Sequence, residues 1–138
     1  MNFLSQITLP ATLDNLSEFI ESVKSCAKKQ GFSQKRISEI ELSLEEVLVN
    51  IFDYAYKKNE TGDVKVSYGP DDDNHFVIQI EDAGMPFDML SLDKPDLTAD
   101  VSEREIGGIG VFLVRELMDD VQYRRENAKN ILTLKVRN

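Results

Sequence analysis

The chain has 138 residues, of which 41% are hydrophobic and 30% are charged, so it is long enough for one compact domain with a continuous core. Its formal net charge of −9 disfavours direct binding to nucleic acid or to anionic membranes, and its single cysteine excludes an internal disulfide and a cysteine-rich zinc site. No apolar run is long enough to span a bilayer and no signal-peptide pattern follows Met1, which predicts a cytoplasmic protein with one domain over residues 1–138.

The first half of the chain predicts one short strand and two amphipathic helices. Loose alternation of apolar residues favours an edge strand over 3–9. Apolar residues at helical spacing then predict a helix over 13–30. Ser33 is a suitable N-cap for a second, longer helix that runs to about Lys58.

The second half predicts two hairpins, with an irregular segment and a short helix between them. In chain order we expect strands over 64–68 and 76–80, a helix over 109–118, and strands over 121–124 and 131–136. Residues 87–106 lose all periodicity and are rich in Asp, Ser, Pro and Thr. Compact domains keep an irregular span of this length mainly for a functional lid.

One face of the longer helix carries a stripe of polar residues. Glu46, Asn50, Asp53 and Lys57 share this face because their spacings are four, three and four. Apolar residues border the stripe on both sides, which a merely solvated face would not need. A Glu and an Asn one turn apart suit a magnesium nucleotide, since an amide oxygen can ligate the cation and a carboxylate can orient or deprotonate the attacking group. The alternative is a narrow solvated stripe with a surface Glu and Asn.

A second motif, Asp82-Ala-Gly-Met-Pro86, follows the predicted strand over 76–80. Its small residues let the backbone approach a flat ligand. A carboxylate at a strand end can accept a hydrogen bond from an exocyclic amine such as that of adenine. A simple Asp-x-Gly turn is the alternative reading.

A third motif, Gly107-Gly-Ile-Gly110, leads straight into the short predicted helix. The free N–H groups and the positive end of a helix can hold phosphate oxygens. A flexible hinge is the alternative. A dinucleotide-binding crossover is disfavoured, because the glycines follow an irregular acidic span and no strand.

In this order, the three motifs resemble those of the bacterial anti-sigma factor serine/threonine kinases. That family lies within the superfamily of ATPases that also contains sensor histidine kinases, gyrase-type topoisomerases and mismatch-repair ATPases. The matching motifs are Glu46-x-x-x-Asn50 for the N box, Asp82-x-Gly84-x-Pro86 for the first glycine box and Gly108-x-Gly110 for the second. The stretch 107–119 is especially similar to the anti-sigma branch, and the resemblance spans nearly the whole chain.

The resemblance implies a fold and a set of site residues. The expected fold is a two-layer α+β sandwich, with helices on one face of a mixed, mostly antiparallel sheet and an ATP lid at about 87–107. The implied roles are Glu46 as the general base, Asn50 as the magnesium ligand, Asp82 as the adenine contact, and Gly84, Gly107, Gly108, Gly110 and Thr133 as nucleotide-binding residues. The lid is acidic, which leaves Arg104 as the main cation able to reach the terminal phosphates and makes it a second catalytic candidate. Tyr54 stands where family members often have a histidine.

The resemblance also implies a function. We expect an ATP- and Mg²⁺-dependent serine/threonine protein kinase, usually a homodimer, that phosphorylates a small antagonist protein and sequesters a sigma factor or similar regulator. A nucleotide-gated protein-binding module without phosphotransfer is the alternative, because it needs the same pocket. A structural dimer with a degenerate pocket is disfavoured, since all three motifs are intact.

Overall fold

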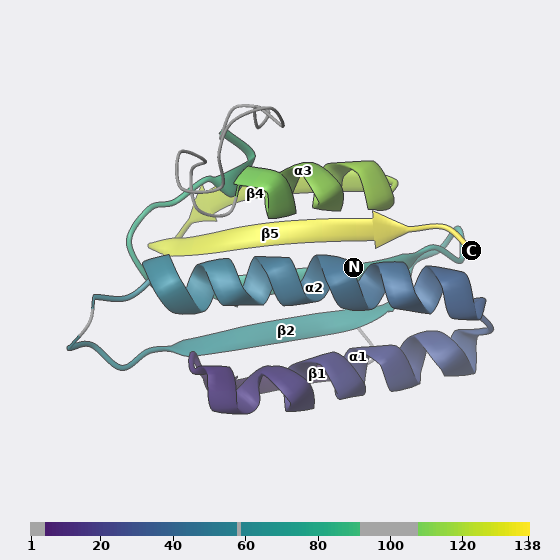
Figure 1. Ribbon diagram of the computed structural model, residues 1–138, viewed down its shortest axis with the longest axis horizontal. Helices are drawn as coiled ribbons and strands as arrows, with labels where there is room; N and C mark the ends of the chain where they lie inside the picture. The colour runs from purple at the N-terminus through teal and green to yellow at the C-terminus, as the bar shows by residue number, and fades with distance from the viewer. Residues whose placement is uncertain (1–4, 58, 92–107) are drawn as a thin grey trace.

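The computed structural model describes residues 5–57, 59–91 and 108–138, which form an antiparallel sheet covered on one face by helices (Figure 1). The helices are α1 (Leu16–Gln30), α2 (Gln34–Tyr54) and α3 (Gly108–Leu117), with short 3-10 turns η1 (Leu13–Asn15) and η2 (Met89–Ser91). The strands are β1 (Ser5–Pro10), β2 (Asp63–Pro70), β3 (Phe76–Asp82), β4 (Asp120–Glu126) and β5 (Lys129–Val136). None of the described helices is long and apolar enough to cross a membrane.

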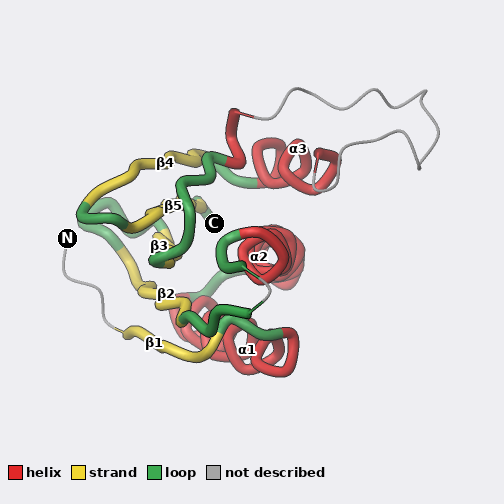
Figure 2. Tube along the Cα trace, turned by 90° about the vertical axis from the view of Figure 1, so that its left-hand side faces the viewer, coloured by secondary structure: helices red, strands yellow, loops and turns green. Residues whose placement is uncertain are grey.

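The described strands lie in the order β1-β2-β3-β5-β4. Every neighbouring pair among them is antiparallel, so the described part of the sheet is antiparallel rather than mixed. The sheet forms one layer and the three helices form the other, with α2 between α1 and α3 (Figure 2). The predicted two-layer α+β fold is therefore confirmed.

The two long helices form for the reasons that the sequence indicates. On α1, the buried residues Phe19, Val23 and Ala27 recur every four positions and face the sheet. The helix ends at Gly31, which adopts the left-handed conformation with φ 96°. At the start of α2, the Ser33 hydroxyl oxygen accepts a hydrogen bond from the backbone N–H of Arg36 and so acts as the predicted N-cap.

The second helix ends four residues earlier than predicted, at Tyr54. The carbonyl oxygen of Ala55 accepts a hydrogen bond from the backbone N–H of Met85, at 2.8 Å. This acceptor would otherwise belong to the next helical turn. The first glycine motif therefore takes the place of that turn and lies directly on the end of α2.

The closing hairpin is longer than predicted, because its turn is shorter. Asn127 and Ala128 alone connect β4 to β5, with φ values of 52° and 62°. A two-residue turn with positive φ at both positions matches the twist of the strands that it joins. Residues that were expected in the turn, Asn130 among them, are consequently part of β5.

Arg36 ties the start of α2 to the end of α3 and to the last residues of the chain. Its Nη1 donates to the carbonyl oxygen of Leu117 at 3.1 Å, and its Nε donates to that of Arg137 at 2.8 Å. Its Nη2 forms an ion pair with Asp119 Oδ2 at 2.6 Å. The C-terminal end of α3 is thereby held against the N-terminal end of α2.

Candidate functional site

Asp82 ends β3 with its side chain on the helix-covered face, where only 4% of the residue is exposed. Its Oδ1 accepts hydrogen bonds from the backbone N–H of Gly84 at 2.9 Å and from Asn130 Nδ2 at 3.0 Å. No residue that the structure describes donates to Oδ2, so this oxygen is available to a ligand. Burial raises the pKa of the carboxyl group, although both hydrogen bonds act in the opposite direction.

Asn130 holds the Asp82 carboxylate and the loop after it. The strand register places Asn130 directly opposite Asp82. Its Nδ2 also donates to the carbonyl oxygen of Met85 at 2.8 Å. Its Oδ1 accepts from the Tyr123 hydroxyl at 2.6 Å and from the backbone N–H of Phe87 at 3.2 Å. With both ends of the amide engaged, Asn130 is a rigid support for the acceptor Asp82.

The sequence did not single out Asn130, although a signal was present. Leu132, Leu134 and Val136 are buried at every second position of β5. Extending that alternation backwards puts Asn130 on the same face. The signal was missed because residue 130 was assigned to the turn.

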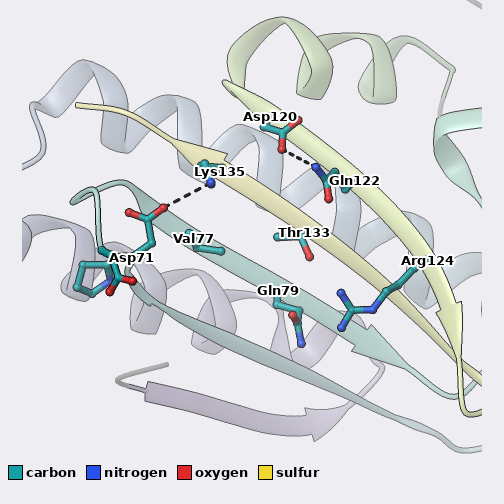
Figure 3. Close-up of a pocket in the computed structure, with 10 residues that line it drawn as sticks. Asp71, Val77, Gln79, Asp120, Gln122, Arg124, Thr133 and Lys135 are labelled. Carbon is teal, nitrogen blue, oxygen red and sulfur yellow. Dashed lines mark hydrogen bonds and ion pairs between the residues drawn. The ribbon is translucent and has the colours of Figure 1, made fainter. Parts of the chain in front are cut away.

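Thr133, which was predicted to bind nucleotide, lies on the other face of the sheet. It stands between the buried residues Leu132 and Leu134, so strand alternation directs its side chain away from the helices. Figure 3 shows it beside Gln79 and Gln122, in a polar groove of about 880 Å³ on the uncovered face. The structure therefore does not bring Thr133 to Asp82, and its assignment is corrected.

Gly84 is required by a close approach to the end of α2. A Cβ atom at this position would lie 2.1 Å from the carbonyl oxygen of Ala55. The carbonyl oxygen of Gly84 accepts a hydrogen bond from Arg125 Nη1 at 2.9 Å. One residue earlier, the backbone N–H of Ala83 donates to the Tyr56 hydroxyl at 2.9 Å. These contacts fix the first glycine motif between the end of α2 and the sheet.

Asp82 lines a small cavity between α2 and the sheet, of about 10 Å³. Its walls are mostly apolar and include Ile51 and Ala55 from α2 and Leu132 from β5. A cavity of this volume is at the lower limit for one water molecule. It is far too small for a nucleotide base, so the evidence for a ligand here is the free acceptor Oδ2 of Asp82 and not the volume of the cavity.

Asn50 is the buried member of the polar stripe on α2, with 3% of the residue exposed. Its Nδ2 donates to the backbone carbonyl oxygen of Glu46 at 2.7 Å, which fixes the orientation of the amide. Within the described ranges, nothing donates to its Oδ1. An oriented amide oxygen without a protein partner is a suitable ligand for a hard cation. Asp53 is exposed, and Lys57 lies beyond the end of the helix.

Glu46 lies against the first turn of α3. A Cβ atom at Gly110 would be 2.0 Å from Glu46 Oε2, so the carboxylate contacts the glycine directly. Gly108 is the first residue of this helix. The structure thus brings Glu46, Asn50 and the start of α3 together. Gly107 and Arg104 lie outside the described residues.

Comparisons with known proteins show the family to which the chain is similar. The model of the histidine kinase-like ATPase domain family matches residues 9–136. The serine-protein kinase RsbW of Listeria monocytogenes is 30% identical over 132 residues, which are 92% of this chain and 83% of the relative. The serine-protein kinase RsbW of Oceanobacillus iheyensis is 27% identical over 136 residues, which are 94% and 84% of the two chains.

Two solved structures share the fold. One contains the RsbU and RsbW domains of Rv1364c from Mycobacterium tuberculosis, with a TM-score of 0.69 and 16% identity over 96% of this chain. This chain spans about a third of that larger protein, 32% of its length. The other is the SiaB-SiaC complex from Pseudomonas aeruginosa, with a TM-score of 0.67, 18% identity, and coverage of 97% of this chain and 89% of that one. The chain therefore belongs to the histidine kinase-like ATPase domain family and, within it, to the anti-sigma factor serine/threonine kinases, as its three motifs predicted.

Proposed function

We propose that this protein is an ATP- and Mg²⁺-dependent serine/threonine protein kinase that phosphorylates a small antagonist protein and sequesters a sigma factor or similar regulator. The observation that supports the proposal most directly is the contact of the Glu46 carboxylate with the first turn of α3 at Gly110. That contact puts a proton acceptor beside a helix N-terminus, where phosphate oxygens bind. The names of the relatives, serine-protein kinases, agree with this reading.

The described residues fit ATP and magnesium. The exocyclic amine of adenine would donate to Asp82 Oδ2, and the ring would need more room than the cavity of about 10 Å³ beside Asp82 provides. The phosphates would lie toward the N-terminus of α3, and Asn50 Oδ1 would be the protein ligand of the cation. Magnesium supplies charge neutralisation at the phosphate oxygens when it is bound.

In the proposed reaction, the hydroxyl oxygen of a serine or threonine on the partner protein forms a bond to the γ-phosphorus of ATP. The bond from that phosphorus to the bridging oxygen breaks, and ADP leaves with the electron pair. The hydroxyl proton passes to the Glu46 carboxylate. Arg104 remains a candidate, proposed from the sequence, for stabilising the charge on the transferred group.

The test is transfer of labelled phosphate from ATP to candidate antagonist proteins, with magnesium present. The Glu46→Gln variant should bind ATP normally and transfer phosphate about 10² to 10⁴ times more slowly, which is the usual contribution of a general base. Glu18→Gln, at an exposed acid on α1, is the matched control and should transfer at the normal rate. Normal transfer by Glu46→Gln would remove the base role. Nucleotide-dependent partner binding without any transfer would favour the binding-module alternative.

We also propose a cytoplasmic homodimer. Strand β1 is one edge of the described sheet, and edge strands present unpaired backbone groups to a second copy. Sedimentation at several protein concentrations would test this. A monomer at micromolar concentration would contradict it.

A further inference from the structure

Two exposed leucines lie on neighbouring helices beside the proposed catalytic residue. Leu42 on α2 is 54% exposed, and Leu113 on α3 is 44% exposed. Leu42 is one helical turn from Glu46, and Leu113 is one helical turn from Gly110. We refer to Leu42 and Leu113 together as the leucine patch.

Contacts at both ends of the helix pair align the patch. Arg36 meets Leu117 at one end, and Glu46 meets Gly110 at the other, so α2 and α3 run antiparallel. Figure 1 shows the two helices side by side on the same face of the sheet. Because the Glu46 and Gly110 positions touch, the residues one turn further along each helix lie opposite one another. The leucine patch therefore lies across the contact between α2 and α3.

Carboxylates surround this patch. The acidic residues one helical turn from its leucines are Glu39, Glu45 and Glu46 on α2 and Glu116 on α3. Glu39 is paired with Arg36 at 3.1 Å. Across the ranges that the structure covers, Glu45, Glu46 and Glu116 form no ion pair. An apolar centre with an uncompensated acidic rim is complementary to an apolar side chain flanked by basic ones.

Building on the proposed kinase function, we propose that the leucine patch docks the protein substrate. The segment it accepts carries an apolar side chain flanked by lysine or arginine, close in sequence to the phosphate-accepting serine or threonine. The apolar side chain covers Leu42 and Leu113, and the basic side chains pair with Glu45 and Glu116. Because Leu42 is only about 6 Å from Glu46 along the helix, docking there brings the hydroxyl group to the proton acceptor.

The same charges argue against two other occupants. A second copy of the chain in a two-fold contact would bring each acidic rim against its own equivalent, and like charges repel. The segment 92–107 of this chain is acidic in sequence, with Asp93, Asp96, Asp100, Glu103 and Glu105 against Lys94 and Arg104. It would meet the same repulsion. A basic segment of another protein is favoured on both counts.

Two fluorescein-labelled peptides test the proposal without any need for phosphate transfer. Both carry one serine and one leucine, and the leucine is flanked by two lysines in one and by two glutamates in the other. Fluorescence anisotropy should give at least tenfold tighter binding of the lysine peptide, and added salt should weaken it. The double variant Leu42→Ser/Leu113→Ser should bind that peptide about a hundredfold more weakly, because each lost leucine contact weakens binding by about tenfold, or roughly 1.5 kcal/mol. Leu13→Ser is the matched control, since Leu13 is 62% exposed on η1 and should be neutral.

Charge reversal at the acidic residues provides an independent test of the docking proposal. Glu45→Lys/Glu116→Lys should invert the preference between the two peptides, whereas Asp72→Lys, on the exposed β2–β3 loop, should not. The docking proposal would be overturned if both peptides bind equally or if neither binds. It would also be overturned if Leu13→Ser loses as much affinity for the lysine peptide as the double leucine variant does. A change in sedimentation of the leucine variants would also overturn it, because a second copy would then occupy the patch.

Steady-state kinetics distinguishes this proposal from the kinase proposal. The substrate is a protein that the labelled-ATP assay has identified. The leucine variants should raise KM for that protein at least tenfold and leave kcat and ATP binding unchanged. If transfer proceeds with an unchanged KM, the kinase stands and the docking surface falls. If the lysine peptide binds but no protein is ever phosphorylated, the surface stands and the kinase falls.

Discussion

Replacing Gly110 with alanine should damage phosphate transfer without damaging the fold. The added Cβ would lie 2.0 Å from Oε2, 2.6 Å from Cδ and 3.1 Å from Cγ of Glu46. Non-bonded atoms settle at about 3.5 Å, so the carboxylate must retreat by about 1.5 Å. Misplacement of a catalytic group by 1 Å can cost about 10²-fold in rate, so we expect kcat to fall by about that factor.

Stability should change little in this variant, because the three atoms nearest to the added Cβ all belong to the flexible side chain of Glu46. Alanine also has a higher helix propensity than glycine, by up to about 1 kcal/mol, which offsets any strain in α3. The melting temperature of Gly110→Ala should therefore equal or exceed that of the unmodified protein. Differential scanning fluorimetry measures it.

A double-mutant cycle identifies the cause of the lost rate. In Glu46→Ala the carboxylate is absent, so adding Gly110→Ala should slow transfer no further. ATP affinity, measured by calorimetry, should be the same within a few-fold for Gly110→Ala and the unmodified protein. Additive losses of rate, or a loss of ATP affinity that accounts for the whole effect, would refute a role through Glu46.

Three further substitutions test the Asp82 site and the closing turn. Asp82→Asn keeps Oδ1 but replaces Oδ2 with a donor, so thermal shifts should no longer favour ATP over GTP. Burial raises the pKa of Asp82 above its unfolded value, so the free energy of unfolding falls as pH rises through the folded pKa. Asp82→Asn removes this titration. The gain in its unfolding free energy over the unmodified protein, measured in urea, should therefore be largest at pH 7 and absent below about pH 4. Gly84→Ala should lower the unfolding free energy by about 2 kcal/mol or more, because the clash at 2.1 Å is with the backbone of Ala55. Ala128→Gly should raise it by about 0.5 kcal/mol by relieving the positive φ of 62°, whereas no gain would mean that the turn is unstrained.

Site residues whose positions depend on local structure could be predicted from the sequence. Glu46 and Asn50 share a face because helical periodicity is set within a few residues, and the apolar pattern of α2 is strong. Asp82 falls at a strand end because an apolar run stops there. Gly84 follows in the turn, although its contact with Ala55 needed the tertiary structure.

Residues whose positions depend on strand register could not be predicted in the same way. The pairing of Asp82 with Asn130 joins positions 48 residues apart, and it depends on the length of the closing turn. That turn contains Asn127 and Ala128 and lacks the glycine that usually signals a two-residue connection. The nucleotide-binding role of Thr133 came from the family resemblance, and only the observed strand shows that its side chain lies on the uncovered face of the sheet.

The clamp at Arg36 determines how α3 can respond to a ligand. Its hydrogen bond to Leu117 and its ion pair with Asp119 fasten one end of the helix. Gly110, near the other end, lies about 10 Å away along the axis. A helix that is held at its C-terminal end pivots when its N-terminal end is displaced, so a 1 Å displacement at Gly110 tilts the axis by about 5°. Leu113 would swing with it, by less than the tip moves. The contacts of Arg36 would thus form the pivot of α3. Binding of a ligand at the phosphate site would then change the position of residues on the outer surface of the protein.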